Sequence, residues 1–395
     1  MRKFTRLLSL LILLAFTSAC SIGQVSDDVD PEQVVTSTSS QITPTAVSSI
    51  STLTPTPAPT STEIIPKQTE VLNWDFDYSS PEEQGISQDL LDEMQEIISE
   101  QYPAVDSILI VRNGKIILDL HQNSFKDSDV HRIYSGTKSI LSILVGIAID
   151  QGYIESVDVH LLDFFQDKEI NYSGEMKGAI TLEHLMTMTS GMQCLDADTY
   201  GLDWWVEFMG SPNWVSTFLD QPMNAVPGEE FYYCDGSANL VSAILQDSVG
   251  MSLYTFAEQY LFTPLGIDEL YWHQVGGGYY NGSTGVHILP KDYAKIGSLL
   301  LTGGRWQGEQ IVSEEWIASS TSKYIEGSFT DWYGYYWWVD EEGYISAFGL
   351  GNQLLYVIPE ENLIVVIFSQ PEEGRYYDIY AEDILEDLIL PVLKN

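Results

Sequence analysis

The four residues Ser135-Gly136-Thr137-Lys138 stand directly before an apolar run, SILSILVGIAID (139–150). Its apolar residues recur with helical spacing, so the pattern predicts a buried helix that Ser135 opens, with Lys138 one turn along the same face. A serine hydroxyl needs a neighbouring base to act as a nucleophile, and a lysine can be that base if burial lowers its pKa. The helix N-terminus would supply backbone N–H groups for a developing oxyanion.

The spacing of this serine and lysine is not unique in the chain. Ser320 and Lys323 have the same separation, but they lead into the segment YIEG (324–327) and not into a core helix. The first pair therefore becomes a candidate catalytic pair only if the rest of the chain supports it.

Composition excludes several classes of function. The chain has 395 residues, of which 44% are hydrophobic, enough for one large domain or two smaller ones. Its 17 basic and 57 acidic residues give a net charge of −40, which argues against a nucleic-acid partner. The sequence contains no C-x-x-C, H-E-x-x-H or G-x-S-x-G pattern, so neither a zinc site nor an α/β-hydrolase is indicated.

The first twenty residues have the pattern of an export signal. Arg2, Lys3 and Arg6 precede a short apolar stretch (7–16), which ends in TSA and Cys20. This end resembles a bacterial lipobox, so we expect residues 1–20 to be a lipoprotein-type signal peptide and Cys20 to carry a lipid anchor. Thr17 departs from the usual aliphatic residue, and an ordinary secretory signal is the alternative. Both alternatives predict an exported protein, and the first predicts one bound to the extracytoplasmic face of the cell membrane.

A polar tether follows this signal. Residues 21–72 are rich in Ser, Thr and Pro, with too little apolar material to bury a core, and we expect them to be disordered. The folded domain is predicted to span residues 73–395.

Periodicity within this domain predicts an α+β fold. We expect a helix over 81–102, a hairpin whose turn is Asn113-Gly114, a mostly helical middle to about Ile288, strands over 354–358 and 363–368, and a final helix over 379–393. This order predicts an antiparallel sheet flanked by N- and C-terminal helices, with a mostly helical second lobe.

A second candidate element is PGEEFYYCD (227–235), which leads into the helical segment NLVSAIL (239–245). Together with the Ser135/Lys138 pair, it resembles the serine β-lactamase and penicillin-binding-protein superfamily. The resemblance is greatest to its class C-like esterases, D-amino-acid amidases and 6-aminohexanoate-dimer hydrolases. There a Pro-Gly turn precedes Tyr-x-Asn or a variant, a pattern that Tyr233, Cys234 and Asp235 match.

The resemblance implies an acyl-enzyme mechanism. Ser135 would attack an ester or amide carbonyl, with Lys138, neutral or sharing a proton with Tyr233, as general base. Tyr233 would then protonate the leaving group, and neither a metal nor an organic cofactor is needed. Asp235 either bonds Lys138 in place of the family asparagine or caps the following helix.

The third motif of this family, Lys/His-x-Gly on a strand beside the serine, is not present in standard form. The nearest match is Ala347-Phe348-Gly349, followed by LGNQ (350–353), so Gly349, Gly351 and Gln353 are the candidates for the oxyanion region. Because Ala347 cannot clamp a substrate carboxylate, the sequence favours a small-molecule ester or amide substrate. The alternatives are a penicillin-recognising D-Ala-D-Ala carboxypeptidase or β-lactamase, and a binding lipoprotein without turnover.

The sequence leaves three questions open: the pairing of two cysteines, the oligomeric state and the role of five tryptophans. Cys194 and Cys234 either form a disulfide or remain separate thiols. His184 is expected to be structural, and the oligomeric state is not indicated. Five tryptophans either line an acyl pocket or pack in the core: Trp204, Trp205, Trp214, Trp337 and Trp338.

Overall fold

The computed structural model describes residues 76–166, 170, 174–195, 200–328, 332–370 and 380–393. The expected signal peptide, the tether and Cys20 lie outside these residues. Among the helices of the described ranges, none is both long and apolar enough to span a bilayer.

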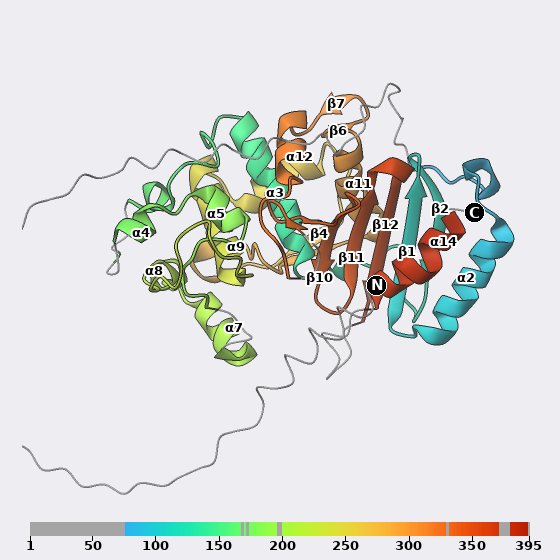
Figure 1. Cartoon of the computed structure of the whole chain (residues 1–395), viewed down its shortest axis with the longest axis horizontal. Coiled ribbons are helices and arrows are strands. Elements are labelled where there is room, and N and C mark those ends of the chain that lie inside the picture. Colours follow the sequence, from blue (N-terminus) through green and yellow to red (C-terminus); the bar gives the residue numbers. More distant parts are fainter. Residues whose placement is uncertain are drawn as a thin grey trace, which may run out of the picture. The chain divides into compact units, whose positions relative to one another are not determined.

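Seven antiparallel strands form the main sheet, which confirms the predicted α+β fold. Its order is β2-β1-β12-β11-β10-β9-β8, so the N-terminal hairpin pairs with the C-terminal strand (Figure 1). The strands are β1 (Val105–Arg112), β2 (Lys115–His121), β8 (Trp332–Tyr333), β9 (Trp338–Val339), β10 (Ile345–Gly349), β11 (Gln353–Ile358) and β12 (Leu363–Ser369).

The predicted hairpin is present. Asn113 and Gly114 both have positive φ, 50° and 79°, which a two-residue type I′ turn requires. The strands on either side of this turn are β1 and β2, which pair antiparallel.

Both faces of the sheet are covered, which explains why its central strands are continuous apolar runs. In β1, Ile108 and Ile110 join one buried cluster, and Leu109 and Val111 join the other. The first cluster lies beneath α2 (Gln88–Gln101) and the C-terminal helical segment, which comprises α13 (Ala381–Asp383), the π-helical η6 (Ile384–Ile389) and α14 (Leu390–Leu393). Helices α2 and α14 lie side by side, although they come from opposite ends of the domain (Figure 1).

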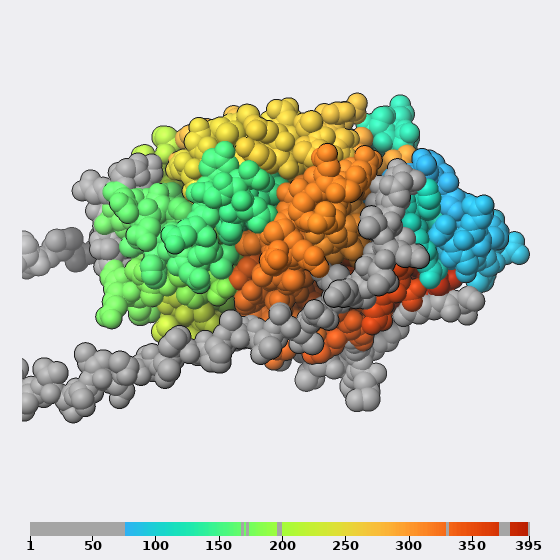
Figure 2. All heavy atoms as spheres, turned by 90° about the horizontal axis from the view of Figure 1, so that it is seen from above, coloured from blue at the N-terminus to red at the C-terminus, as the bar shows by residue number. Residues whose placement is uncertain are grey.

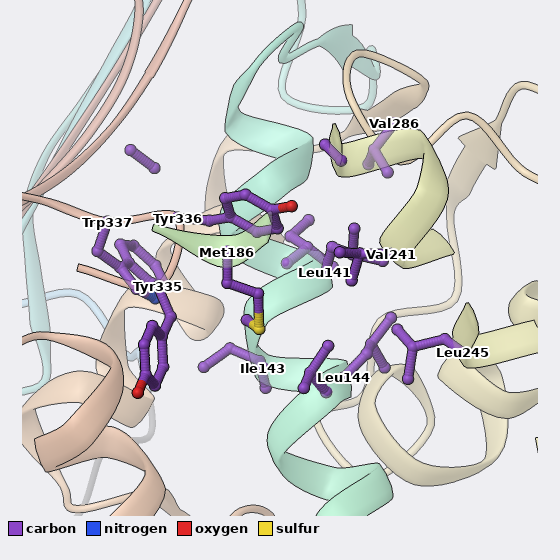
Figure 3. Close-up of a cluster of buried hydrophobic side chains, with 14 of the residues drawn as sticks. Leu141, Ile143, Leu144, Met186, Val241, Leu245, Val286, Tyr335, Tyr336 and Trp337 are labelled. Atoms are coloured by element: carbon purple, nitrogen blue, oxygen red, sulfur yellow. The ribbon is translucent and has the colours of Figure 1, made fainter. Parts of the chain in front are cut away.

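The opposite face packs against α3 (Gly136–Asp150) and α11 (Pro290–Leu301). Helix α3 is buried from Gly136 to Ala148, as the sequence pattern predicts. Figure 3 shows that its apolar side chains are covered from more than one side. Leu144 faces Leu245 of helix α9 (Asp235–Val249), and Met186 lies on another side of α3.

The other elements make up the helical lobe and its connections. Figure 2 shows the green segments from the middle of the chain at one end, and blue α2 at the other. The helices are η1 (Glu82–Gln84), η2 (Leu161–Phe165), α4 (Glu175–Gly178), α5 (Leu182–Met186), α7 (Leu202–Gly210), α8 (Trp214–Leu219), α10 (Leu253–Ala257), η3 (Glu258–Phe262), η4 (Gly276–Gly278), α12 (Glu314–Ser320) and η5 (Pro359–Glu361).

The structure corrects two predicted segments. The helix expected over 81–102 is two helices, η1 and α2, because Gly85 takes a left-handed conformation (φ 75°) that ends the first. The mostly helical middle also contains a small sheet of β3 (His131–Arg132), β4 (Leu270–Trp272) and β5 (Val286–Ile288), whose short strands carry no clear alternation. A two-stranded sheet, β6 (Arg305–Trp306) and β7 (Glu309–Gln310), completes the strands of the described part.

The question left open about the two cysteines is answered by a disulfide. Cys194 and Cys234 are bonded; they lie 40 positions apart in sequence, with a Cα–Cα distance of 5.8 Å. Both are buried. The bond therefore ties the loop before α7 to the residue that precedes α9.

We expect Gly146→Ala to destabilise the protein. A Cβ at position 146 would overlap the indole of Trp316, so the substitution should lower the free energy of unfolding by about 1–3 kcal/mol, although alanine is the better helix former. Urea denaturation measures this change. Gly210→Ala is the control, because no atom lies within 4 Å of a Cβ there, and it should not destabilise. Equal midpoints for the two variants would show that the helix packing is described incorrectly.

The disulfide leads to a second stability prediction. Removing a cross-link that closes a 40-residue loop should cost about 4 kcal/mol, most of it through the unfolded chain. We expect Cys194→Ala/Cys234→Ala to melt at a lower temperature than the wild type under oxidising conditions, and reductant to remove the difference. A wild-type melting temperature that reductant does not change would contradict the cross-link.

Candidate active site

Ser135 lies where β3 ends and α3 begins. It is the N-cap residue of α3, and Tyr134 before it has φ 44°, a left-handed conformation that is uncommon for a residue other than glycine. The helix start is fixed from two sides. Thr137 Oγ1 accepts a hydrogen bond from Val286 N at 3.1 Å, and a Cβ on Gly136 would clash with the Tyr293 hydroxyl. The backbone therefore holds the half-buried Ser135 side chain in one place.

Lys138 is the centre of the site. Its side chain is only 1% exposed, and its ammonium nitrogen donates three hydrogen bonds: to Ser135 Oγ at 3.0 Å, to Asp235 Oδ1 at 2.6 Å and to the carbonyl oxygen of Ser283 at 3.2 Å. An ammonium group has three N–H donors, so all of them are used. The sequence-predicted serine and lysine are thus in direct contact.

The protonation state of Lys138 differs from the sequence-based expectation. Burial by itself lowers the pKa of the lysine, but Asp235 and Tyr233 together outweigh burial, so the Lys138 pKa lies above its ordinary value. Of the two states expected for this lysine, neutral or sharing a proton with Tyr233, this direction speaks against the neutral one in the resting site. The physical reason for the raised Lys138 pKa is the carboxylate of Asp235, which stabilises the ammonium form.

Asp235 takes the first of the two roles expected for it. It is the first residue of α9, and its carboxylate bonds Lys138. The side chain is 22% exposed, so the ion pair reaches the surface of the site.

Tyr233 contacts the same lysine. The Lys138 nitrogen lies 4.7 Å from the centre of the Tyr233 ring, and this ring stacks on Trp338 at 5.8 Å. Five tryptophans were considered for an acyl pocket, and of these Trp338 lies beside a candidate catalytic residue. Trp214 and Trp337 are fully buried and belong to the core.

The third acceptor of Lys138 is the carbonyl oxygen of Ser283. Two asparagines that the sequence analysis did not single out, Asn239 and Asn281, hold this residue in place. Asn239 donates to the Asp235 carbonyl at 2.9 Å and to Ser283 Oγ at 3.2 Å, and it accepts from Gly282 N at 3.0 Å. Asn281 accepts from Ser283 N at 3.0 Å. A polar residue at 239, one turn after Asp235 and at the start of the apolar segment, is the signal that could have indicated this support.

The strand expected beside the serine is β10. A Cβ on Gly349 would clash with the carbonyl oxygen of Ile133, so only glycine lets β10 approach the backbone before Ser135. Within the described residues the N–H of Ser135 has no hydrogen-bond partner, whereas Gly136 N and Thr137 N donate to carbonyls. These features leave room for the predicted oxyanion site, which stays a prediction.

Gln353 does not face this site. Its side chain is buried, donates to the carbonyls of Gly351 at 2.9 Å and Ser369 at 2.7 Å, and accepts from Ser369 N at 3.2 Å. Gly351, with φ 74°, forms the turn between β10 and β11. The glutamine therefore holds the β10–β11 turn against β12, and its side chain is not available to a substrate.

The second serine-lysine pair is not a site. Ser320 Oγ donates to the Ile317 carbonyl, and Lys323 pairs with Glu341 at 3.7 Å, so the structure does not join the two side chains. His184 accepts from Thr181 N at 3.1 Å in a capping box, the structural role expected for it. Within the described ranges, no three His, Cys, Asp or Glu side chains are grouped so as to hold a metal ion.

Comparisons with known proteins show what the chain is similar to. The chain is 24% identical over 318 residues to the 6-aminohexanoate-dimer hydrolase of Paenarthrobacter ureafaciens, which covers 72% of this chain and 77% of that protein. Among solved structures, the penicillin-binding protein of Bacillus halodurans has a TM-score of 0.60 at 16% identity over 75% of this chain and 99% of that one. EstCE1, a hydrolase with promiscuous acyltransferase activity, has a TM-score of 0.61 at 16% identity over 75% and 98%.

These structural likenesses show a shared fold. The model of the Beta-lactamase family matches residues 94–387, which is most of the chain. The span includes Ser135, Lys138, Tyr233 and Asp235. The chain therefore belongs to the Beta-lactamase family of serine hydrolases.

Proposed function

We propose that this protein cleaves small ester or amide bonds through an acyl-enzyme on Ser135. The observation that carries the proposal is the contact of the buried Lys138 ammonium with Ser135 Oγ at 3.0 Å, beside Asp235 and Tyr233. A serine and a basic group within hydrogen-bonding distance, with the base oriented by a third group, is the arrangement that nucleophilic catalysis needs. Two similar proteins carry the names of hydrolases, which supports the same reaction class.

The first step is the attack of Ser135 on the substrate, and it depends on which group takes the hydroxyl proton. Ser135 Oγ attacks the carbonyl carbon, and its hydroxyl proton passes to Lys138. Because the resting lysine is an ammonium, it takes this proton only as it hands one of its own to Tyr233, which acts here as a phenolate. Asp235 stays ionised, with its Oδ1 2.6 Å from the lysine nitrogen. The oxyanion forms near the Ser135 N–H and the end of β10.

The second half of the reaction uses the same groups in reverse. Once Tyr233 has given its proton to the leaving group, which completes acylation, a water molecule attacks the acyl-enzyme carbonyl and its proton passes by way of Lys138 to Tyr233. Free Ser135 is restored when that proton returns to Oγ.

Residues of β10 argue against a β-lactam or D-Ala-D-Ala substrate. The strand ISAFG (345–349) carries no basic side chain, and Ala347 is buried. A substrate carboxylate would therefore find no cation on the strand beside the serine. Labelling by a fluorescent penicillin that persists without turnover would favour the alternative of a binding protein.

We also propose that the protein is exported and held at the membrane by a lipid on Cys20. The pattern of residues 1–20 supports this location, and so does the Cys194–Cys234 disulfide, because disulfides persist mainly in oxidising compartments. Metabolic labelling with a fatty-acid analogue, compared between the wild type and Cys20→Ala, tests the anchor.

We expect Ser135→Ala, Lys138→Met and Tyr233→Phe each to lower kcat/KM for p-nitrophenyl butyrate by at least about 10³-fold, because the three side chains act on one proton. The double variants should lose little more than the single ones. Ser320→Ala is the control for the second serine and should keep the activity. Full activity of folded Ser135→Ala would refute the proposed nucleophile, and no hydrolysis of this ester or of the matching p-nitroanilide by the wild type would refute the proposed reaction.

A further inference from the structure

The carboxylate of Asp235 has one oxygen bound to the protein and one that is not. Oδ1 accepts from Lys138 at 2.6 Å, whereas Oδ2 has no hydrogen-bond partner among the described residues. The side chain is 22% exposed and borders the half-buried Ser135 and Tyr233. A second acceptor oxygen is thus available to a substrate.

The chemistry of this oxygen differs from that of the asparagine that the resemblance leads one to expect at position 235. An asparagine amide both accepts and donates hydrogen bonds, but an ionised carboxylate only accepts. A carbonyl or carboxylate group of a substrate would meet a lone pair at Oδ2, whereas an N–H donor would be bound. A charged donor and a charged acceptor form the strongest such bond.

We propose that Asp235 makes this enzyme selective for substrates whose acyl group carries a protonated amine; this inference rests on the proposed function and names the substrate class of the same site. The amine donates to Oδ2 while Lys138 donates to Oδ1, so one carboxylate bridges two ammonium groups. The acyl group stays on Ser135 through both half-reactions, so this contact acts in acylation and in deacylation.

Geometry limits the length of the acyl group. Ser135 Oγ and Asp235 Oδ1 both lie within hydrogen-bonding distance of the same nitrogen, so they are no more than about 6 Å apart. A carbonyl carbon bonded to Oγ can place an amine at Oδ2 through a spacer of one or two carbons. The β-alanyl group, with two carbons between carbonyl and amine, fits this span.

The charges around the site favour the same class. The three N–H groups of Lys138 are already used, and β10 carries no basic residue. Arg132, near the start of α3, is bound to Thr284 at 3.1 and 3.2 Å and lies over the Tyr134 ring. An anionic acyl group would therefore face Asp235 without a cation that is free to bind it.

The test uses three p-nitrophenyl esters of similar size: β-alanyl (cationic), butyryl (neutral) and succinyl (anionic). For the wild type we expect kcat/KM to be at least about tenfold higher for the β-alanyl than for the butyryl ester, and lowest for the succinyl ester. In Asp235→Asn the β-alanyl to butyryl ratio should fall to about one, whatever happens to the absolute rates. Glu100→Gln removes the same charge from the exposed end of α2, on the other face of the sheet, and should leave the ratio unchanged.

A wild-type measurement covers the case in which Asp235→Asn does not fold. Propylammonium should inhibit hydrolysis of the butyryl ester competitively, and butyrate should not. Equal β-alanyl and butyryl values in the wild type, a ratio that survives Asp235→Asn, or inhibition by butyrate alone would overturn the inference while leaving the proposed hydrolase intact. A preference for the succinyl ester would overturn it in favour of a cation such as Arg132. Failure of the wild type to cleave any of the three esters or their p-nitroanilides would count against the proposed function itself.

Discussion

A buried ammonium group is the constraint on which this site depends. Burying an ion costs several kcal/mol unless its hydrogen bonds are satisfied within the protein. Lys138 meets that requirement with acceptors from three segments that are far apart in sequence: the start of α3, the start of α9 and the loop before β5. A fold that places this lysine in the interior must therefore also bring Ser135 and Asp235 to it.

The surrounding structure holds these three segments rigidly. Asn239 links the start of α9 to the loop that carries Ser283, and the disulfide of Cys234 fixes the residue next to Tyr233. On the other side, Gly349 lets β10 approach the backbone before Ser135. The seven-stranded sheet, apolar on both faces, packs against α3, so Ser135 stands at the start of a helix that has little freedom to move.

Patterns of residues close in sequence predicted the elements that depend on such residues, a helix and a turn. The apolar run after Lys138 predicted the buried helix, because a helix has a characteristic apolar periodicity. Asn113-Gly114 predicted the hairpin turn, because these two residue types favour positive φ. Tyr233 needed the family resemblance, since one tyrosine among 23 carries no signal of its own. The side-chain contacts of Gln353 could not be predicted, because sequence spacing shows that a residue lies near a site, but not which way its side chain points.

The pKa of Lys138 could not be predicted from the sequence because two opposing effects meet at one atom. Burial alone would favour a neutral base, and the sequence shows that the helix is buried. The competing effect comes from Asp235, 97 residues away in sequence, whose distance of 2.6 Å is a property of the fold. With an asparagine at this position, no carboxylate charge would oppose the effect of burial on the Lys138 pKa, and the lysine would lose its proton more readily. The aspartate instead keeps the resting site as an ion pair. Under the proposed function, the same carboxylate both delays the lysine's action as a base and presents its Oδ2 to the substrate.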